Sequence, residues 1–132
     1  MDSISPDALA DRIERGERVT LLDTRNRSEI DEWRFEGPTV DRVEVPYMKF
    51  VAAGVSGDPA DLLPDDVAEP VVAVCARGEA SDEVAAQLRE AGVDAVNLER
   101  GMLGWARVYR RVELAADTGN ATVYQYQRPS SG

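Results

Sequence analysis

Short apolar runs alternate with amphipathic segments along most of the chain. The clearest run is residues 71–74, four apolar residues in succession after Glu69 and Pro70. A continuous apolar run of this length is typical of a central strand in a parallel sheet, where both faces of the strand are covered. The same pattern predicts further short strands over residues 19–22, 43–45 and 95–98.

Helix signals lie between these strands. Ser5 is a suitable N-cap, Pro6 suits the first helical position, and Leu9 and Ile13 share one face before Gly16 ends the helix. Residues 81–91 form a second amphipathic segment, with Val84, Leu88 and Ala91 on its apolar face. Three more helices are predicted over residues 28–33, over residues 47–53 and from Gly101 onward, with a loop over residues 54–66.

Strands that alternate with helices through short loops predict an α/β fold. In such a fold the sheet is open and parallel, and helices cover both of its faces.

The net charge of the chain limits the classes of partner that it can bind. The 132 residues include 15 Lys and Arg against 25 Asp and Glu, a net charge of −10. Such a surface repels phosphate, so we expect neither nucleic acid nor an anionic membrane as a partner. Lys49 is the only lysine; an acidic surface that avoids lysine indicates a halophilic protein, and codon bias in a GC-rich genome is the alternative explanation.

Two residue types limit the chemistry. The chain has no histidine, which excludes Ser-His-Asp and Cys-His catalysis and most catalytic zinc sites, so we expect no metal and no cofactor. The single cysteine, Cys75, excludes an internal disulfide and fits a reducing compartment. Because the N-terminus also lacks a signal-peptide pattern and no apolar run is long enough to span a bilayer, the expected location is the cytoplasm.

Cys75 lies where the predicted central strand gives way to a helix. Ligands of open parallel sheets bind at the carboxyl ends of strands, where helix N-termini present backbone N–H groups. A short loop can turn its amides toward the sulfur, and Arg77 adds a cation, so the thiol is expected to ionise below its ordinary range. The alternative is that Cys75 is a small buried apolar residue that ends a strand.

Asp23 and Arg25 end the first predicted strand and should lie at the same rim as Cys75. Asp23 is a candidate to brace the loop, and Arg25 is a candidate to attract an anionic substrate. The alternative is a surface ion pair that holds the strand–helix turn. Ser81 is interpreted as a helix cap.

Four segments, in this order, resemble the rhodanese (sulfurtransferase) domain over about residues 3–110. They are Leu-Leu-Asp-Thr-Arg at 21–25, Val-Val-Ala-Val-Cys-Ala-Arg-Gly-Glu-Ala-Ser at 71–81, Ala-Ala-Gln-Leu-Arg-Glu-Ala-Gly-Val at 85–93, and Leu-Glu-Arg-Gly-Met-Leu-Gly-Trp at 98–105. The resemblance implies a parallel sheet of about five strands within residues 1–112. It also implies that Cys75 takes up sulfane sulfur as a persulfide and passes it to a thiol or another thiophilic acceptor.

On this hypothesis Cys75 is the nucleophile and the loop after it binds the substrate. Because Glu79 places a carboxylate at the rim, we expect a thiol persulfide to be a better donor than dianionic thiosulfate. Related phosphatases use Cys-x5-Arg, whereas Ser81 stands at that position here, so phosphate chemistry is disfavoured. The expected substrate-binding residues are Ala76, Arg77, Gly78, Glu79, Ala80, Ser81 and Arg25, with Asp23 in support.

Two other functions remain open at this stage. The first is a non-catalytic interaction or regulatory module that keeps the fold to dock a neighbour. The second is a redox sensor that oxidises the same thiol reversibly to sulfenic acid.

Residues 113–132 are predicted to be a linker followed by a strand over residues 122–127. Residues 123–132 are similar to the opening strand of metallo-β-lactamase-fold hydrolases of the persulfide dioxygenase and glyoxalase type. This similarity implies a following hydrolase domain as a partner, with Cys75 delivering or receiving persulfide sulfur.

Overall fold

The computed structural model describes residues 2–36, 39–105, 110–113 and 122–125. Its helices are α1 (Pro6–Glu14), α2 (Arg27–Glu32), α3 (Tyr47–Ser56), the short 3-10 helix η1 (Pro59–Leu62), α4 (Glu79–Glu90) and α5 (Gly101–Trp105). Its strands are β1 (Ser3–Ile4), β2 (Val19–Asp23), β3 (Trp33–Glu36), β4 (Val40–Glu44), β5 (Val71–Val74), β6 (Ala95–Leu98), β7 (Arg110–Glu113) and β8 (Thr122–Gln125).

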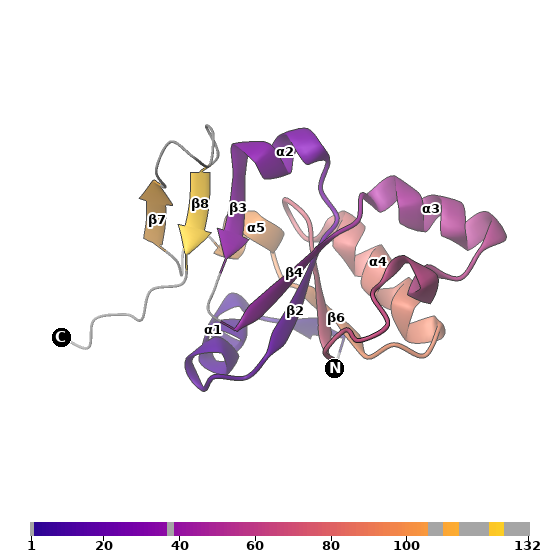
Figure 1. The fold of residues 1–132 in the computed structure, drawn as a ribbon, viewed down its shortest axis with the longest axis horizontal. Helices are drawn as coiled ribbons and strands as arrows, with labels where there is room; N and C mark the ends of the chain where they lie inside the picture. The colour runs from indigo at the N-terminus through magenta and orange to yellow at the C-terminus, as the bar shows by residue number, and fades with distance from the viewer. Residues whose placement is uncertain (1, 37–38, 106–109, 114–121, 126–132) are drawn as a thin grey trace.

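The main sheet confirms the predicted fold class. It has five strands in the order β1-β6-β5-β2-β4, and every neighbouring pair is parallel (Figure 1). Strand β5 lies at the centre and all four of its residues are buried, as its apolar run predicted. The outermost strand β1 has two residues, which pair with Asn97 and Leu98. The hydrophobic pattern did not predict β1, because two residues are too few to show a periodicity.

Helices cover both faces of this sheet. Successive strand residues point to opposite faces, so the apolar residues divide into two clusters. On one face, Leu9 and Ile13 of α1 and Met102 of α5 pack on alternate residues of β2, β5 and β6. On the other face, Phe50 of α3 and Leu88 of α4 pack on the intervening residues. The core therefore reaches Val74 at the carboxyl end of β5, where Cys75 follows.

Several local predictions are confirmed and some boundaries move. Ser5 caps α1 by accepting a hydrogen bond from the Ala8 amide, and Gly16 has a positive φ of 78° just beyond the helix. Helix α2 ends one residue before Trp33, which begins β3 instead. Strand β4 starts at Val40 because it pairs with β2 along its whole length, and the predicted loop over residues 54–66 contains the end of α3 and η1.

A second, three-stranded sheet has the order β3-β8-β7. The predicted strand near the C-terminus is present as β8, which pairs in parallel with β3 and antiparallel with β7. Residues 126 and 127 of that predicted strand, and the rest of the chain to residue 132, lie outside the described residues. The division into a domain over residues 1–112 and a linker with the start of a following domain stays a prediction.

No helix in the described part of the chain is long and apolar enough to cross a lipid bilayer.

Candidate active site

Cys75 directly follows the central strand β5, and α4 begins four residues later at Glu79. The sequence predicted that this helix begins at Ser81, which is wrong by two residues. The helix starts earlier because Gly78 takes a left-handed conformation, with φ 96°, and serves as its N-cap. A residue without a Cβ adopts this conformation without strain, so the four residues 75–78 suffice to turn the chain from strand to helix. We call residues 75–81 the thiol loop.

Hydrogen-bond donors of the thiol loop point at the sulfur. The amide nitrogen of Gly78 lies 3.0 Å from Cys75 Sγ, and that of Ser81 lies 3.5 Å away. The Ser81 hydroxyl lies 3.3 Å from the same sulfur. Cys75 is 8% exposed, so these donors act where little water competes with them. The loop geometry is therefore that of a cradle for a sulfur anion.

The pKa of the Cys75 thiol reflects two opposed effects. Burial raises the pKa because it penalises the charged thiolate. The hydrogen bonds from the Ser81 hydroxyl and from the amides of Ser81, Arg77 and Gly78 outweigh burial, so the net pKa lies below its ordinary value. Arg77 thus contributes through its backbone amide, in line with the predicted role of the loop amides, and the added cation expected from its side chain is not among the causes of the lowered pKa.

Ser81 does not cap the helix, contrary to its predicted role. It lies within the first turn of α4 and is completely buried. Its hydroxyl oxygen lies 2.6 Å from Asn97 Oδ1 as well as near the sulfur. Asn97, on β6, also donates from Nδ2 to the carbonyl oxygen of Gly78 at 3.0 Å. Sequence reasoning missed Asn97, because it read as an ordinary polar residue in a short strand.

The back of the thiol loop is held by the start of α5. The amides of Met102 and Leu103 donate to the carbonyl oxygens of Cys75 and Ala76, at 2.9 and 3.1 Å. These bonds turn the loop carbonyls away from the sulfur. Gly101 makes this approach possible, because a Cβ on it would lie 2.3 Å from the Cys75 carbonyl oxygen.

We expect Gly101→Ala to displace the thiol loop and to slow alkylation of Cys75. The matched control is Gly92→Ala, because Gly92 also has a positive φ, 91°, but a Cβ there has open space around it. Each variant should lose about 1–2 kcal/mol of stability from the backbone conformation alone. Thermal unfolding measures the loss of stability in each variant, and the alkylation rate of Cys75 reports the displacement of the thiol loop. Equal alkylation rates in the two variants would show that the close approach at Gly101 does not shape the site.

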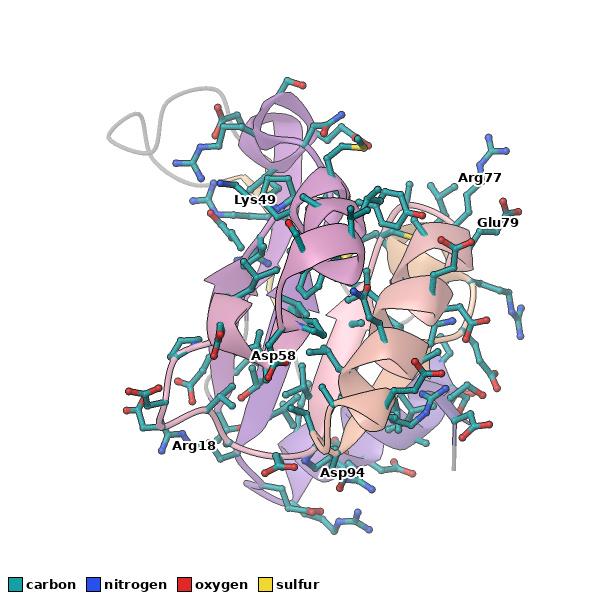
Figure 2. All side chains as sticks on the ribbon, turned by 90° about the vertical axis from the view of Figure 1, so that its right-hand side faces the viewer. Arg18, Lys49, Asp58, Arg77, Glu79 and Asp94 are labelled. Atoms are coloured by element: carbon teal, nitrogen blue, oxygen red, sulfur yellow. The ribbon has the colours of Figure 1, made fainter. Side chains whose placement is uncertain are left out.

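A cavity of about 450 Å³ opens above the sulfur. Glu79 is exposed at its rim, as predicted, and the side chain of Arg77 extends outward at the same corner (Figure 2). The structure thus brings Cys75 together with Ala76, Arg77, Glu79, Ala80 and Arg25. The full lining is Thr24, Arg25, Asn26, Glu29, Tyr47, Met48, Cys75, Ala76, Arg77, Glu79 and Ala80.

Asp23 and Arg25 form a buried ion pair, which differs from the surface pair that the sequence left open. The Arg25 side chain donates to the carboxylate of Asp23 twice, from Nε at 2.9 Å and from Nη2 at 2.7 Å. Arg42 donates to the same carboxylate at 3.0 Å. Burial raises the pKa of Asp23, but the hydrogen bonds from Arg25 and Arg42 and the charge of Arg25 lower it below its ordinary value overall. Asp23 therefore holds a cation at the wall of the Cys75 cavity.

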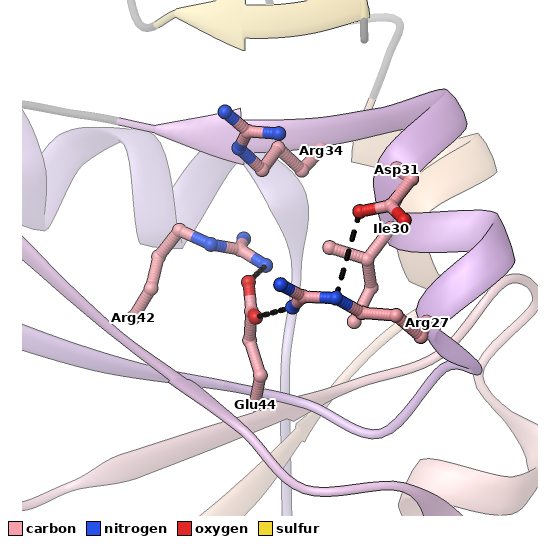
Figure 3. Close-up of a pocket in the computed structure, with 6 residues that line it drawn as sticks. All are labelled: Arg27, Ile30, Asp31, Arg34, Arg42 and Glu44. Carbon is pink, nitrogen blue, oxygen red and sulfur yellow. Dashed lines mark hydrogen bonds and ion pairs between the residues drawn. The ribbon is translucent and has the colours of Figure 1, made fainter. Parts of the chain in front are cut away.

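A second cavity, of about 510 Å³, lies between α2 and β4 (Figure 3). Glu44 lies at its centre and accepts from Arg27 at 2.6 Å and from Arg42 at 3.0 Å. Arg42 also binds Asp23, whose other partner, Arg25, lines the Cys75 cavity. The residues that line the second cavity are Arg27, Ile30, Asp31, Arg34, Arg42 and Glu44.

Comparisons with known proteins agree with this geometry. The model of the rhodanese-like domain family matches residues 5–108. A rhodanese-like domain protein from Staphylococcus aureus has 26% identity and a TM-score of 0.56, with 80% of this chain and 92% of that chain covered. A rhodanese homologue from Thermus thermophilus has 28% identity and a TM-score of 0.50, with 76% and 96% covered. The human single-domain sulfurtransferase TSTD1, at 21% identity, shares the fold with a TM-score of 0.59, with 81% of this chain and 96% of that chain covered. No curated protein sequence matches the chain.

Proposed function

The chain belongs to the family of rhodanese-like domains, and on this premise we propose that it is a sulfurtransferase that carries sulfane sulfur on Cys75. The observation that supports this most directly is the set of donors around Sγ, led by the Gly78 amide at 3.0 Å. They stabilise a thiolate, which is the nucleophilic form of cysteine. No histidine is needed to activate it, and the chain has none.

The proposed reaction has two displacement steps at sulfur. The Cys75 thiolate attacks the terminal sulfur of a thiol persulfide, the S–S bond of the donor breaks, and the donor leaves as a thiolate. The terminal sulfur and its proton are then bonded to Cys75 Sγ. In the second step an acceptor thiolate attacks this outer sulfur, and Cys75 leaves as the thiolate that the loop amides stabilise. The protein is unchanged over the cycle, and no oxidant or reductant is consumed.

The charges around the cavity favour a thiol persulfide over thiosulfate as the donor. Glu29 and Glu79 place two carboxylates at the lining, against the guanidinium groups of Arg25 and Arg77. The charge of Arg25 is already shared with Asp23. A dianion such as thiosulfate therefore meets little net positive charge, whereas a thiol persulfide needs only access to Sγ.

The proposal is tested by incubating the protein with cysteine persulfide or with thiosulfate and weighing it intact. We expect a gain of one sulfur atom, faster with the persulfide, and loss of the gain after addition of a thiol. Replacing Glu79 by Gln should bring the thiosulfate rate closer to the persulfide rate, because a rim carboxylate is removed. No adduct from either donor, in protein whose Cys75 reacts with iodoacetamide, would contradict the proposal and would favour an interaction module.

A thiol redox sensor is the second candidate, supported by the same lowered pKa and by the cavity that gives access to the sulfur. It requires that peroxide oxidise Cys75 to a sulfenic acid faster than a persulfide loads it. Comparing the two rates under the same conditions decides between the candidates.

A further inference from the structure

Asn97 contacts two of the residues that donate hydrogen bonds to the Cys75 sulfur, namely Gly78 and Ser81. It lies on β6, the neighbour of β5, and is 7% exposed. Its Nδ2 donates to the carbonyl oxygen of Gly78 at 3.0 Å, and its Oδ1 lies 2.6 Å from the Ser81 hydroxyl. Both partners belong to the thiol loop and both donate toward Cys75 Sγ.

The orientation of this amide is fixed by chemistry. A carbonyl oxygen such as that of Gly78 can only accept, so the NH₂ group of Asn97 must face it. The oxygen of Asn97 then faces Ser81, and the Ser81 hydroxyl must be the donor in that pair. Since a hydroxyl has one hydrogen, Ser81 donates either to Asn97 or to the sulfur at any moment.

We propose that Asn97 is a positioning residue that holds the sulfur-binding donors of the thiol loop in place. Its NH₂ group fixes Gly78 in the left-handed conformation that aims the Gly78 amide at Sγ. Its oxygen accepts the Ser81 hydrogen while the thiol is neutral, which keeps the Ser81 hydroxyl oxygen 3.3 Å from the sulfur. When Cys75 ionises, its proton leaves through the cavity, and the Ser81 hydrogen turns from Asn97 to the thiolate.

Removing the Asn97 side chain has two opposed effects on the thiol. It frees the Ser81 hydrogen for the sulfur, which favours the thiolate. It also frees Gly78 to turn its amide away, which disfavours the thiolate. The loss of the Gly78 hydrogen bond should be the larger effect. That bond is made to a charged thiolate, and it is about twice as strong as the neutral bond between Ser81 and Asn97 that must break when Ser81 turns to the sulfur.

The test uses the fact that Cys75 is the only cysteine, so alkylation by iodoacetamide reports on it alone. We expect Asn97→Ala to raise the midpoint of the rate against pH, and to lower the rate at neutral pH on the order of tenfold. Asn97→Asp keeps the shape and the acceptor oxygen but removes the donor to Gly78 and adds a negative charge. It should raise the midpoint further.

The control is Thr20→Val, which changes a buried hydroxyl on β2 and should leave the profile unchanged. The ionisable groups that line the cavity above the sulfur are Arg25, Glu29, Tyr47, Arg77 and Glu79. They are the same in every variant, and Asn97→Ala adds no charge, so a moved midpoint in Asn97→Ala reports the hydrogen bonds. An unchanged or lowered midpoint in folded Asn97→Ala protein would overturn the proposal.

A measurement on the unmodified protein avoids any dependence on how the variants fold. In an NMR titration, the side-chain amide signals of Asn97 and the backbone amide signal of Gly78 should move with the midpoint found by alkylation. Both movements should vanish in Cys75→Ser. Signals of Asn97 that stay fixed while Gly78 moves would overturn the proposal.

The positioning role rests on the proposed function only in what the stabilised thiolate is used for. Neither experiment uses a sulfur donor, so each can succeed in a protein that transfers no sulfur. Conversely, the unmodified protein could take up sulfur while Asn97→Ala leaves the alkylation midpoint unchanged. That pair of results would reject the positioning role and leave the proposed function standing.

Discussion

Replacing Cys75 by serine is expected to reduce sulfur transfer to background, a loss on the order of 10⁴-fold or more, because the reaction loses its nucleophile. Serine is close in size to cysteine, and Cys75 sits at the end of a well-buried strand. The fold should therefore remain, with a similar thermal unfolding midpoint. The measurement is the initial rate of transfer from cysteine persulfide to a thiol acceptor, with intact mass as a second readout.

The matched control for this variant is again Thr20→Val, which should transfer sulfur at the rate of the unmodified protein. If Cys75→Ser loses transfer but keeps its fold, Cys75 is the sulfur carrier. If Cys75→Ser transfers sulfur normally, the cysteine does not carry the sulfur, and the proposed chemistry is wrong.

Replacing Asp23 by asparagine is expected to cost about 3–5 kcal/mol of unfolding free energy, because it removes the buried negative charge to which Arg25 and Arg42 both donate. The side chains of Asp23 and Arg25 are 0% and 1% exposed. An asparagine would also present an NH₂ group to donors of Arg25 and Arg42, which now share one carboxylate. Urea denaturation measures the loss. A cost below 1 kcal/mol would show that the pair is not coupled to the fold.

The exposed pair of Arg18 and Asp41 provides the comparison for Asp23. Its side chains are 66% and 49% exposed, so Asp41→Asn should cost about 0–1 kcal/mol. The variants therefore share one chemical change and differ in burial.

The Asp23 contribution also has a defined pH dependence. Because the pKa of Asp23 is lower in the folded protein than in the unfolded chain, its stabilisation is complete above the unfolded pKa, about 4. It is lost as the pH falls through the folded pKa. The difference in stability between the unmodified protein and Asp23→Asn should thus be constant at neutral pH and shrink below about pH 4. A difference that grows on acidification would contradict this assignment.

The hydrophobic pattern was sufficient for the central elements of the fold. Residues 71–74 and 95–98 were predicted as strands and are strands with those bounds. The run at 71–74 is strong because both faces of β5 are covered, which favours apolar residues at every position; residues 95–98 follow the same pattern except at Asn97. At the periphery the pattern failed, as with the two residues of β1 and the extension of β4 to Val40. There, pairing with a neighbouring strand decides the conformation, and pairing leaves little trace in the local sequence.

The candidate site, like the fold, has features that the local sequence predicts and features that only tertiary contacts decide. Local order along the chain determined that a lone cysteine follows a buried strand and precedes a helix, and that Gly78 lies between them. These neighbours are close in sequence, so their geometry follows from strand, turn and helix rules. The sequence therefore also placed the loop amides near the sulfur.

Only the tertiary structure decided which distant groups complete the site. Asn97 on β6 binds the thiol loop, and Arg42 on β4 binds Asp23. Gly101 lets the start of α5 approach the backbone of the thiol loop closely. Each contact joins residues on different strands or helices, and the packing of those elements sets its distance. Local sequence rules describe a residue's own backbone, whereas a hydrogen bond across the sheet depends on strand order and register, which arise only when the whole domain folds.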